Sequence, residues 1–270
     1  MEQMAHPSST PLLVAEIGNT TAMFAVFSGT DPIDSLQVAT AALSSPEAVG
    51  ELLQPLLARH SLAADAVISS VVPRAGEAAG RWLLDILPGR VLAVDSTLNL
   101  PFRISYDPPS ALGADRLSLC ARCCMLEEEA AVIALDIGTA ITFDVLSADR
   151  SYLGGLIMPG LELMASALHE RTAQLPRVEV SRPERLMGLS TADCIRSGVV
   201  WGCVLQVEGL VRKIRGWLRS EHGEGYARVV ATGGRAPLIV SMMEMPPLLD
   251  PHAVSRGARY LFELNRITVS

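Results

Sequence analysis

Aromatic residues and charged residues are both scarce in this sequence. Phe, Trp and Tyr make up 4% of the 270 residues and Asp, Glu, Lys and Arg 19%, whereas 49% are hydrophobic. The interior must therefore consist mainly of small and aliphatic side chains, and extensive disorder is not expected. The sequence also lacks an uninterrupted run of about 18 apolar residues, so we predict no membrane-spanning segment.

An excess of basic residues is also missing. The formal net charge is −7 and the isoelectric point is about 5.3. Proteins that bind nucleic acid non-specifically need a cationic face for the phosphate backbone, so we expect no nucleic-acid partner. A chain of this length can bury a large core and can form one large domain or two lobes.

The five cysteines are an odd number, and the first ten residues have neither the basic nor the apolar region of a secretion signal. Both features indicate a reduced, cytoplasmic protein. The spacing of Cys120, Cys123 and Cys124 could suggest a metal knuckle or a redox pair. The second pair of ligands that a structural zinc site needs is missing, so we favour small thiols packed on an Ala-rich helix.

Two segments share one order of parts: an apolar strand, an acid, Ile-Gly, a turn with hydroxyl side chains and a second apolar strand. The first segment runs from residue 12 to 26 and contains Glu16; the second runs from residue 132 to 145 and contains Asp136. Apolar runs separated by a short glycine-containing turn predict β-hairpins. The repetition suggests two similar lobes with a nucleotide between them.

Each predicted turn has the composition of a phosphate-binding loop. Gly18 and Gly138 have no Cβ, so nearby backbone N–H groups and Thr hydroxyls could approach an anionic phosphate closely. An acid at the end of the strand could hold a cation that screens the phosphate charge. Two ordinary hairpins whose acids are turn formers are the alternative, and the presence of two copies favours phosphate binding.

Helical and strand-like segments alternate between and after the hairpins. Apolar residues at helical spacing predict helices, and short apolar runs bounded by Pro or Gly predict strands. This alternation is typical of α/β proteins with a partly parallel sheet. The predicted helices span residues 45–60 (kinked or shortened by Pro55), 75–87, 114–128, 161–169, 191–219 and 251–264, and the further predicted strands span residues 66–73, 90–95, 152–160 and 228–236.

The stretch Gly113-Ala114-Asp115-Arg116 lies after a Pro-Pro loop, at the predicted start of a helix. Free N–H groups and the positive end of the helix dipole gather at such a position. Asp115 could take a proton from a substrate hydroxyl, and Arg116 could form a two-pronged pair with a substrate carboxylate. Alternatively, Asp115 only satisfies the helix start and Arg116 pairs with a nearby acid, which is the more common role of first-turn acids.

Taken together, these motifs resemble the type III pantothenate kinases. The match runs in order from about residue 12 to residue 264, and the combination is much more specific than any single motif. That family belongs to the superfamily of acetate kinase, sugar kinases, Hsp70 and actin. The motifs that carry the resemblance are residues 16–20, 113–116, 136–144, 152–155 with Pro159-Gly160, 172–176, and Thr232-Gly233-Gly234.

The resemblance implies an α/β fold of duplicated ribonuclease-H-like lobes, residues 11–128 and 129–270, with an interlobe nucleotide cleft. The implied activity is ATP-dependent phosphorylation of pantothenate to 4′-phosphopantothenate, the first step of coenzyme A biosynthesis. ATP, Mg²⁺ and a monovalent cation, K⁺ or NH₄⁺, are the implied cofactors, and a homodimer is the implied assembly.

The resemblance also assigns roles to individual residues. Asp115 is the expected general base, drawing the proton from the primary hydroxyl of pantothenate, and Asp136 the expected site of the monovalent cation. Thr191 is expected to reach pantothenate from the neighbouring subunit. The ATP phosphates and Mg²⁺ are expected at Glu16, Ile17, Gly18, Asn19, Thr20, Thr21, Ala22 and Met23, the nucleotide also at Thr139, and pantothenate at Tyr106, Gly113, Ala114, Asp115, Arg116 and Thr191.

Two positions depart from the family pattern, which has Asp where this chain has Glu16 and usually Asn where it has Ser190. Mg²⁺ tolerates little deviation from octahedral geometry, and Glu places the carboxylate about one bond length further out. A non-catalytic paralogue that uses the nucleotide site for regulation is therefore one alternative. A kinase for another small hydroxy acid is a second, because Arg116 and Tyr106 suit any carboxylate-bearing substrate.

Overall fold

The computed structural model describes residues 11–126 and 129–266, so the N-terminal ten residues and the predicted end of the helix at residues 127–128 lie outside the described part. The chain forms two compact units. The first comprises the residues up to Phe102, Tyr106–Leu126 and the segment from His252 onward; the second comprises Arg103–Ser105 and Glu127–Pro251.

The first unit contains a five-stranded sheet in the order β3-β2-β1-β4-β5. β2 is antiparallel to β1 and β3, whereas β1, β4 and β5 are parallel. Successive residues of a strand face opposite sides of the sheet. Since Leu13, Ala15 and Ile17 lie in one hydrophobic core, Glu16 faces the other side. The strands are β1 (Leu12–Ile17), β2 (Thr21–Ser28), β3 (Asp31–Ala39), β4 (Asp65–Ser70) and β5 (Val91–Ala93).

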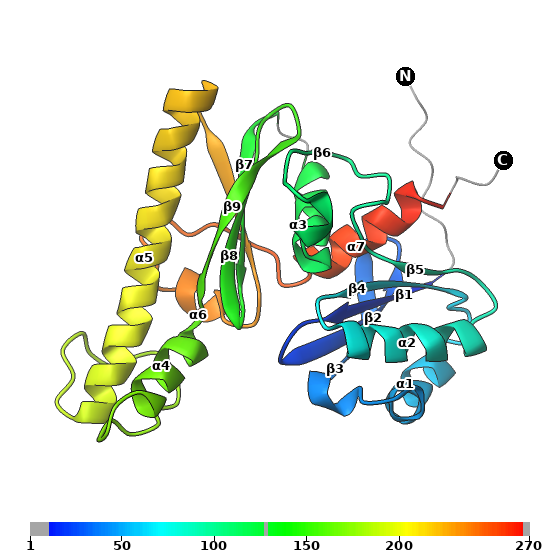
Figure 1. The fold of residues 1–270 in the computed structure, drawn as a ribbon, viewed down its shortest axis with the longest axis horizontal. Coiled ribbons are helices and arrows are strands. Elements are labelled where there is room, and N and C mark those ends of the chain that lie inside the picture. Colours follow the sequence, from blue (N-terminus) through cyan, green and yellow to red (C-terminus); the bar gives the residue numbers. More distant parts are fainter. Residues whose placement is uncertain (1–10, 127–128, 267–270) are drawn as a thin grey trace. The chain divides into compact units, whose positions relative to one another are not determined.

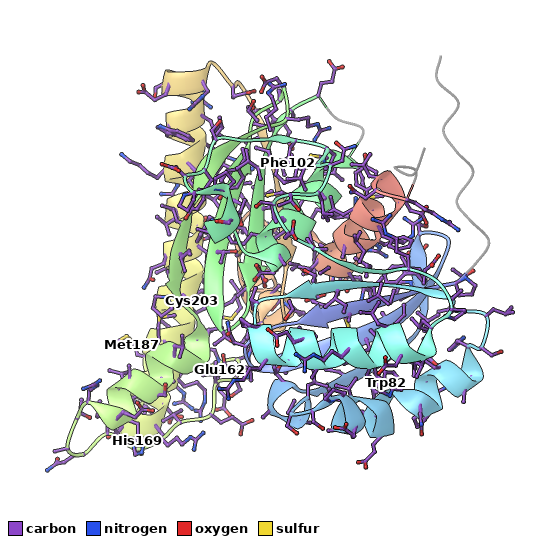
Figure 2. The ribbon with its side chains drawn as sticks, turned by 45° about the vertical axis from the view of Figure 1, so that its right-hand side comes forward. Trp82, Phe102, Glu162, His169, Met187 and Cys203 are labelled. Carbon is purple, nitrogen blue, oxygen red and sulfur yellow. The ribbon has the colours of Figure 1, made fainter. Side chains whose placement is uncertain are left out.

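Helices α1 (Pro46–Arg59) and α2 (Pro73–Ile86) cover that core on one face of the sheet. A Cβ on Gly50 would lie 2.5 Å from Nε1 of Trp82, so the glycine lets the two helices pack closely beside this ring, which is labelled in Figure 2. The prediction that Pro55 shortens α1 is wrong, because the helix continues to Arg59. Pro55 is exposed, and water can satisfy the carbonyl that lacks its N–H partner.

Helices α3 (Ala114–Cys124) and α7 (Ala253–Leu264) lie side by side on the opposite face of this sheet (Figure 1). α7 contacts β1 and β4, and α3 contacts β4. The two helices approach each other closely at Gly257, where an added Cβ would lie 1.7 Å from the carbonyl oxygen of Ser118. The contact between α3 and α7 therefore depends on the absence of a side chain at residue 257.

The second unit repeats this strand order. Its sheet runs β11-β10-β7-β8-β9-β6, and the first five strands correspond in turn to β5, β4, β1, β2 and β3 of the first unit. Both predicted hairpins, β1–β2 and β7–β8, are confirmed. The strands are β6 (Arg103–Ile104), β7 (Ala131–Ile137), β8 (Ala140–Leu146), β9 (Ser151–Pro159), β10 (Ala227–Thr232) and β11 (Leu248–Leu249).

Helix α5 (Thr191–His222) covers one face of the second sheet together with α4 (Leu161–Glu170) and α6 (Ala236–Val240) (Figure 1). Within the described residues, α5 is the one helix whose length and composition would allow it to cross a membrane. Its apolar stripe instead belongs to the core of the second unit, which identifies it as a core helix. The core residues of α5 are Ile195, Val199, Val200, Cys203, Val204, Val207, Val211, Ile214 and Leu218.

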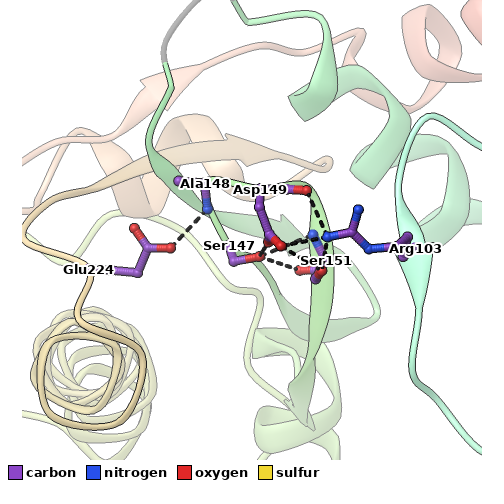
Figure 3. A network of polar contacts seen from close by, with 6 residues as sticks. All are labelled: Arg103, Ser147, Ala148, Asp149, Ser151 and Glu224. Atoms are coloured by element: carbon purple, nitrogen blue, oxygen red, sulfur yellow. Dashed lines mark hydrogen bonds and ion pairs between the residues drawn. The ribbon is translucent and has the colours of Figure 1, made fainter.

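A polar network fixes the short strand β6 beside β9 (Figure 3). The Arg103 guanidinium donates to Ser151 Oγ at 2.9 Å and to the Asp149 carboxylate. The Ser147 hydroxyl also donates to Asp149, and the N–H of Ala148 donates to a carboxylate oxygen of Glu224 at 2.9 Å. The network thus joins β6, the turn between β8 and β9, and the segment after α5.

Several elements are not among the sequence predictions. They are β3, an edge strand that contains Pro32, the two-residue strands β6 and β11, helix α6, and 3₁₀ turns at Thr40–Ala42 and Pro109–Ala111. The expected lobe boundaries of 11–128 and 129–270 remain a prediction about domains. The compact units differ from them at two places. Arg103–Ser105 groups with the second unit, and α7 groups with the first unit through its contacts with α3, β1 and β4.

Replacing Gly257 with Ala should destabilise the first unit, because the new methyl group would overlap the Ser118 carbonyl and push α3 and α7 apart. We expect a loss of about 1–3 kcal/mol in the free energy of unfolding, measured by denaturant titration. Gly216→Ala in α5 is the matched control, since no atom lies within 4 Å of its added Cβ. The free energy of unfolding of that control should rise by roughly 0.5–1 kcal/mol. Equal unfolding midpoints for Gly257→Ala and the wild type would contradict the close contact between α3 and α7.

Candidate active site

Glu16 stands at the end of β1, on the face of the sheet that α3 and α7 cover. Its neighbours in the sheet are Met23 on β2 and Ser69 on β4. The hydroxyl of Ser255, on α7, donates a hydrogen bond to Glu16 Oε2 at 2.8 Å. Ser255 is fully buried, and the Glu16 carboxylate is partly buried. One carboxylate oxygen is therefore held by α7.

The turn that follows Glu16 is braced from within the first unit and exposed at its tip. The N–H of Gly18 donates to the Thr21 carbonyl at 3.0 Å, and the hydroxyl of Thr40 donates to the Gly18 carbonyl at 2.7 Å. The side chains of Asn19, Thr20 and Thr21 are exposed. A rigid turn with exposed hydroxyl and amide groups suits the binding of an anionic phosphate.

Asp115 lies in the first turn of α3. Its carboxylate folds back over the helix start, where Oδ1 accepts a hydrogen bond of 2.7 Å from the N–H of Arg116. Gly113 makes room for this arrangement, because a Cβ there would lie 2.7 Å from Asp115 Oδ1. Burial raises the pKa of Asp115 above its ordinary value, and the N–H and guanidinium of Arg116 oppose this effect in part.

The two acids of the first unit act on each other. Burial raises the pKa of Glu16, the hydrogen bond from Ser255 lowers it, and the negative charge of Asp115 raises it. Two poorly solvated carboxylates that repel each other are costly to a fold unless a cation or a proton compensates them. Their proximity marks this face of the first unit as the candidate site.

Arg116 and Tyr106 lie next to each other. Arg116 is buried, and its guanidinium carbon lies 5.8 Å from the centre of the Tyr106 ring, within the range of a cation–π contact. A buried guanidinium held beside an aromatic ring can present its planar donor groups to a carboxylate. The predicted residues Tyr106, Gly113, Ala114, Asp115 and Arg116 all belong to the first unit.

The second hairpin places Asp136 at the end of β7, opposite Thr142 on β8 and beside Thr232 on β10. Directly opposed residues of neighbouring strands point to the same face. Thr142 Oγ1 is buried and has no hydrogen-bond partner in the described part of the chain. Gly233, with φ of +99°, also lies close, since a Cβ there would be 2.3 Å from Asp136 Oδ1. Asp136 thus lies in an oxygen-lined site.

Thr139 lies in the turn of this second hairpin, which packs against Gly160. The N–H of Gly160 donates to the Thr139 carbonyl at 3.0 Å, and a Cβ on Gly160 would lie 2.2 Å from the Gly138 carbonyl. The turn is therefore fixed against the start of α4. The repeated hairpins differ in one detail, because the acid faces Thr142 in the second and Met23 in the first.

Thr191 is the first residue of α5 and is exposed. Ser190 caps this helix: its Oγ accepts from the N–H of Asp193 at 3.1 Å and donates to the Asp193 carboxylate at 2.7 Å. Ser190, where the family usually has Asn, thus performs the N-cap role that either residue type supports.

Sequence reasoning missed Ser255, Ser69 and Thr142 as neighbours of the two strand-end acids. Ser255 lies on a helix predicted only as the closing element of the chain, and no spacing links it to Glu16. The described residues contain no group of three or more His, Cys, Asp and Glu side chains that could hold a metal ion. Mg²⁺ often binds through one or two carboxylates and substrate phosphates, so this finding agrees with a nucleotide-bound ion.

Solved structures share this fold at low sequence identity. A chain from Campylobacter jejuni described as a Baf family transcriptional activator aligns with a TM-score of 0.55 and 19% identity, covering 94% of this chain and 98% of the other. The ethanolamine utilization protein EutJ from Carboxydothermus hydrogenoformans aligns with a TM-score of 0.51 and 12% identity, covering 93% and 89%. These structures share the duplicated α/β sheet arrangement described above, which is the fold class expected from the sequence.

Sequence comparison specifies the family. The type III pantothenate kinase family matches residues 12–213. The type III pantothenate kinase of Chlorobium chlorochromatii (strain CaD3) is 45% identical over 256 residues, 94% of this chain and 96% of the relative. That of Acidiphilium cryptum (strain JF-5) is 37% identical over 253 residues, 92% and 93% of the two chains. The chain belongs to the type III pantothenate kinase family, which confirms the resemblance described above.

Glu16→Gln should stabilise the fold at neutral pH, because it removes a poorly solvated charge but keeps an acceptor for Ser255. A raised carboxyl pKa destabilises the folded state above that pKa, and the effect disappears as the pH falls towards the unfolded value. We therefore expect the Tm gain, roughly 2–4 °C for each kcal/mol relieved, to be largest at neutral pH and to shrink in acid.

The control for this experiment is Glu51→Gln, which changes an exposed glutamate of α1. Its effect should stay within about 0.5 kcal/mol. A Tm for Glu16→Gln that equals or falls below the wild-type value across the pH range would show that the Glu16 carboxylate is not strained by its surroundings.

Proposed function

We propose that this protein transfers the γ-phosphoryl group of ATP to the primary hydroxyl of pantothenate, giving 4′-phosphopantothenate, the first step of coenzyme A biosynthesis. Membership of the type III pantothenate kinase family supports this activity. The observation that carries the proposal is Asp115, a carboxylate with a raised pKa at the start of α3, beside the buried guanidinium of Arg116. The alternative of an inactive paralogue has no observation in its favour.

Asp115 acts as the general base. A raised pKa brings a carboxylate closer to the basicity that proton abstraction from an alcohol requires. Phosphoryl transfer depends mainly on positioning and charge neutralisation, so one base beside an oriented hydroxyl is sufficient help from the protein. The hydroxyl proton moves to the Asp115 carboxylate as the oxygen attacks the γ-phosphorus.

Arg116 and Tyr106 orient the substrate. Pantothenate carries a carboxylate, which the Arg116 guanidinium can bind, and the ring of Tyr106 holds that guanidinium in place. Gly113 and Ala114 bring the backbone of the helix start close to the substrate. The same groups would accept another hydroxy acid, so the family relationship rather than the site's geometry selects pantothenate.

The first hairpin is the proposed phosphate and Mg²⁺ site, from Glu16 and Ile17 through Gly18, Asn19, Thr20 and Thr21 to Ala22 and Met23. Glu16 fits a divalent cation, because its poorly solvated carboxylate lies near a second acid and keeps one oxygen that Ser255 does not bind. Mg²⁺, when bound, would neutralise charge on the phosphates. The protein's own contribution is to orient Glu16 and to brace the turn.

Asp136 and Thr142 fit a monovalent cation, K⁺ or NH₄⁺. The buried Thr142 Oγ1, opposite Asp136 on the same face, is an oxygen for which the described residues provide no hydrogen-bond donor. A cation bound by the two side chains would satisfy it. Thr139, in the adjoining turn, is the proposed contact of the second unit with the nucleotide.

An exposed apolar segment supports a homodimer. Leu186, Met187 and Leu189 are 64%, 76% and 81% exposed, and they directly precede α5; Met187 is labelled in Figure 2. Contiguous exposed apolar residues mark interaction surfaces. Burying them against a second copy would also carry Thr191 towards the pantothenate of the neighbouring subunit. The odd number of cysteines, five, supports a reduced, cytoplasmic setting.

Asp115→Asn should lower kcat by about 10²–10⁴-fold in a coupled assay with ATP, Mg²⁺, K⁺ and pantothenate, because the amide cannot accept the proton. In the wild type, kcat/KM should rise with pH through the raised pKa of Asp115, at a higher pH than an unperturbed aspartate would give. Glu47→Gln, an exposed first-turn acid of α1, is the matched control and should keep its activity. Full activity of Asp115→Asn would rule out the assigned base.

Thr142→Val should weaken the binding of the monovalent cation without destabilising the fold. Without K⁺, the variant should be at least as stable as the wild type, because it removes a buried hydroxyl that has no hydrogen-bond partner among the described residues. With K⁺, the wild type should gain Tm and the variant should gain less, and its activity should need on the order of 10-fold more K⁺. Na⁺ is the comparison ion, and identical responses of both proteins to K⁺ would contradict the site.

A further inference from the structure

The hydrogen bond between Ser255 and Glu16 connects the last helix of the chain to its first strand. Ser255 is fully buried and its hydroxyl reaches Glu16 Oε2 at 2.8 Å, across 239 positions of sequence. A buried hydroxyl aimed at a carboxylate forms a charge-assisted hydrogen bond, which is stronger and more directional than a neutral one. The contact therefore fixes where the carboxylate points.

Glu16 needs such a partner more than a shorter acid would. The sheet neighbour directly opposite it is Met23, whose thioether is at best a weak acceptor and cannot donate to the carboxylate. Glutamate has three rotatable side-chain bonds, and ordering it costs up to about 2 kcal/mol in conformational entropy. A donor from outside the sheet can hold one rotamer and leave the second oxygen available.

The packing of α7 provides that donor at a defined distance. Gly257, two residues after Ser255, allows the backbone of α7 to touch α3 at the Ser118 carbonyl. Ser118 donates to Ser69 Oγ at 3.0 Å, and Ser69 is the parallel neighbour of Glu16 on β4. Ser69 and Ser255 are thus the buried hydroxyl residues next to Glu16, and Ser118 bonds to Ser69. Ser255 is the one shown donating to it.

We infer that Ser255 is a positioning residue, which holds the Glu16 carboxylate in the orientation that binds the Mg²⁺ complex of ATP. This inference rests on the proposed function of Glu16. In this role Ser255 acts through Glu16, to which its hydroxyl donates. The charged residue next to Ser255 in α7 is Arg256, and its guanidinium pairs with Asp31 at 2.8 Å.

The test is a double-mutant cycle between residues 255 and 16. Ser255→Ala should weaken the Mg²⁺-dependent binding of a non-hydrolysable ATP analogue by about 10-fold, measured by calorimetry at fixed nucleotide and varied Mg²⁺. In a Glu16→Asp background, the shorter side chain no longer reaches the hydroxyl, so Ser255→Ala should add less than about 2-fold. Ser118→Ala, which removes a neighbouring buried hydroxyl bonded to Ser69, is the control and should leave binding unchanged.

The inference would be overturned if Ser255→Ala and Ser118→Ala weakened Mg²⁺-dependent nucleotide binding equally. It would also be overturned if Ser255→Ala weakened binding as much in the Glu16→Asp background as in the wild type. A third contrary result would be that Ser255→Ala weakens nucleotide binding to the same degree without Mg²⁺. Tm measurements on all variants confirm that they are folded. Because nucleotide binding is measured without pantothenate, the cycle gives an answer even if the protein phosphorylates a different acceptor. Failure of pantothenate turnover with an intact cycle would contradict only the proposed substrate.

Discussion

The burial of two carboxylates, those of Glu16 and Asp115, is the constraint to which the rest of the first unit responds. Both side chains are poorly solvated, and each has a raised pKa. A fold selected for stability alone would separate two such groups or surround them with water. Here the close contact of α3 with α7 at Gly257 brings Asp115 and Ser255 to the end of β1. Under the proposed function, a bound Mg²⁺ would compensate this buried negative charge.

The duplication of the sheet explains why there are two acid-bearing hairpins and why they need not do the same work. Both acids end the central strand of the same five-strand arrangement. In the second unit, the acid faces Thr142, and the sheet itself offers a further oxygen. In the first, it faces Met23, and the polar partner comes from α7. One architecture thus supports a proposed monovalent site and a proposed phosphate and Mg²⁺ site.

The hairpins were predictable because a strand, a glycine turn and a second strand are local in sequence, and the α/β class and the family followed from their order. The side chains that lie next to Glu16 and Asp136 were not predictable. One extra residue in the first turn places Met23 opposite Glu16, where the second hairpin has Thr142 opposite Asp136, and composition does not reveal that register. Nor does it reveal Ser255, which meets Glu16 only after α7 has folded back onto the first sheet. β3 was not predicted because it contains Pro32, and a proline within a run argues against a strand unless that strand lies at an edge of the sheet, as β3 does.

Proton release on nucleotide binding tests this coupling of buried charge to ligand most directly. Calorimetry of the Mg²⁺ complex of a non-hydrolysable ATP analogue, repeated in mildly acidic buffers of different ionisation enthalpy, gives the number of protons exchanged. Because a bound cation lowers the raised pKa of Glu16, the wild type should release protons and Glu16→Gln should release fewer. Equal proton exchange by the two proteins would contradict the central role given to the Glu16 carboxylate.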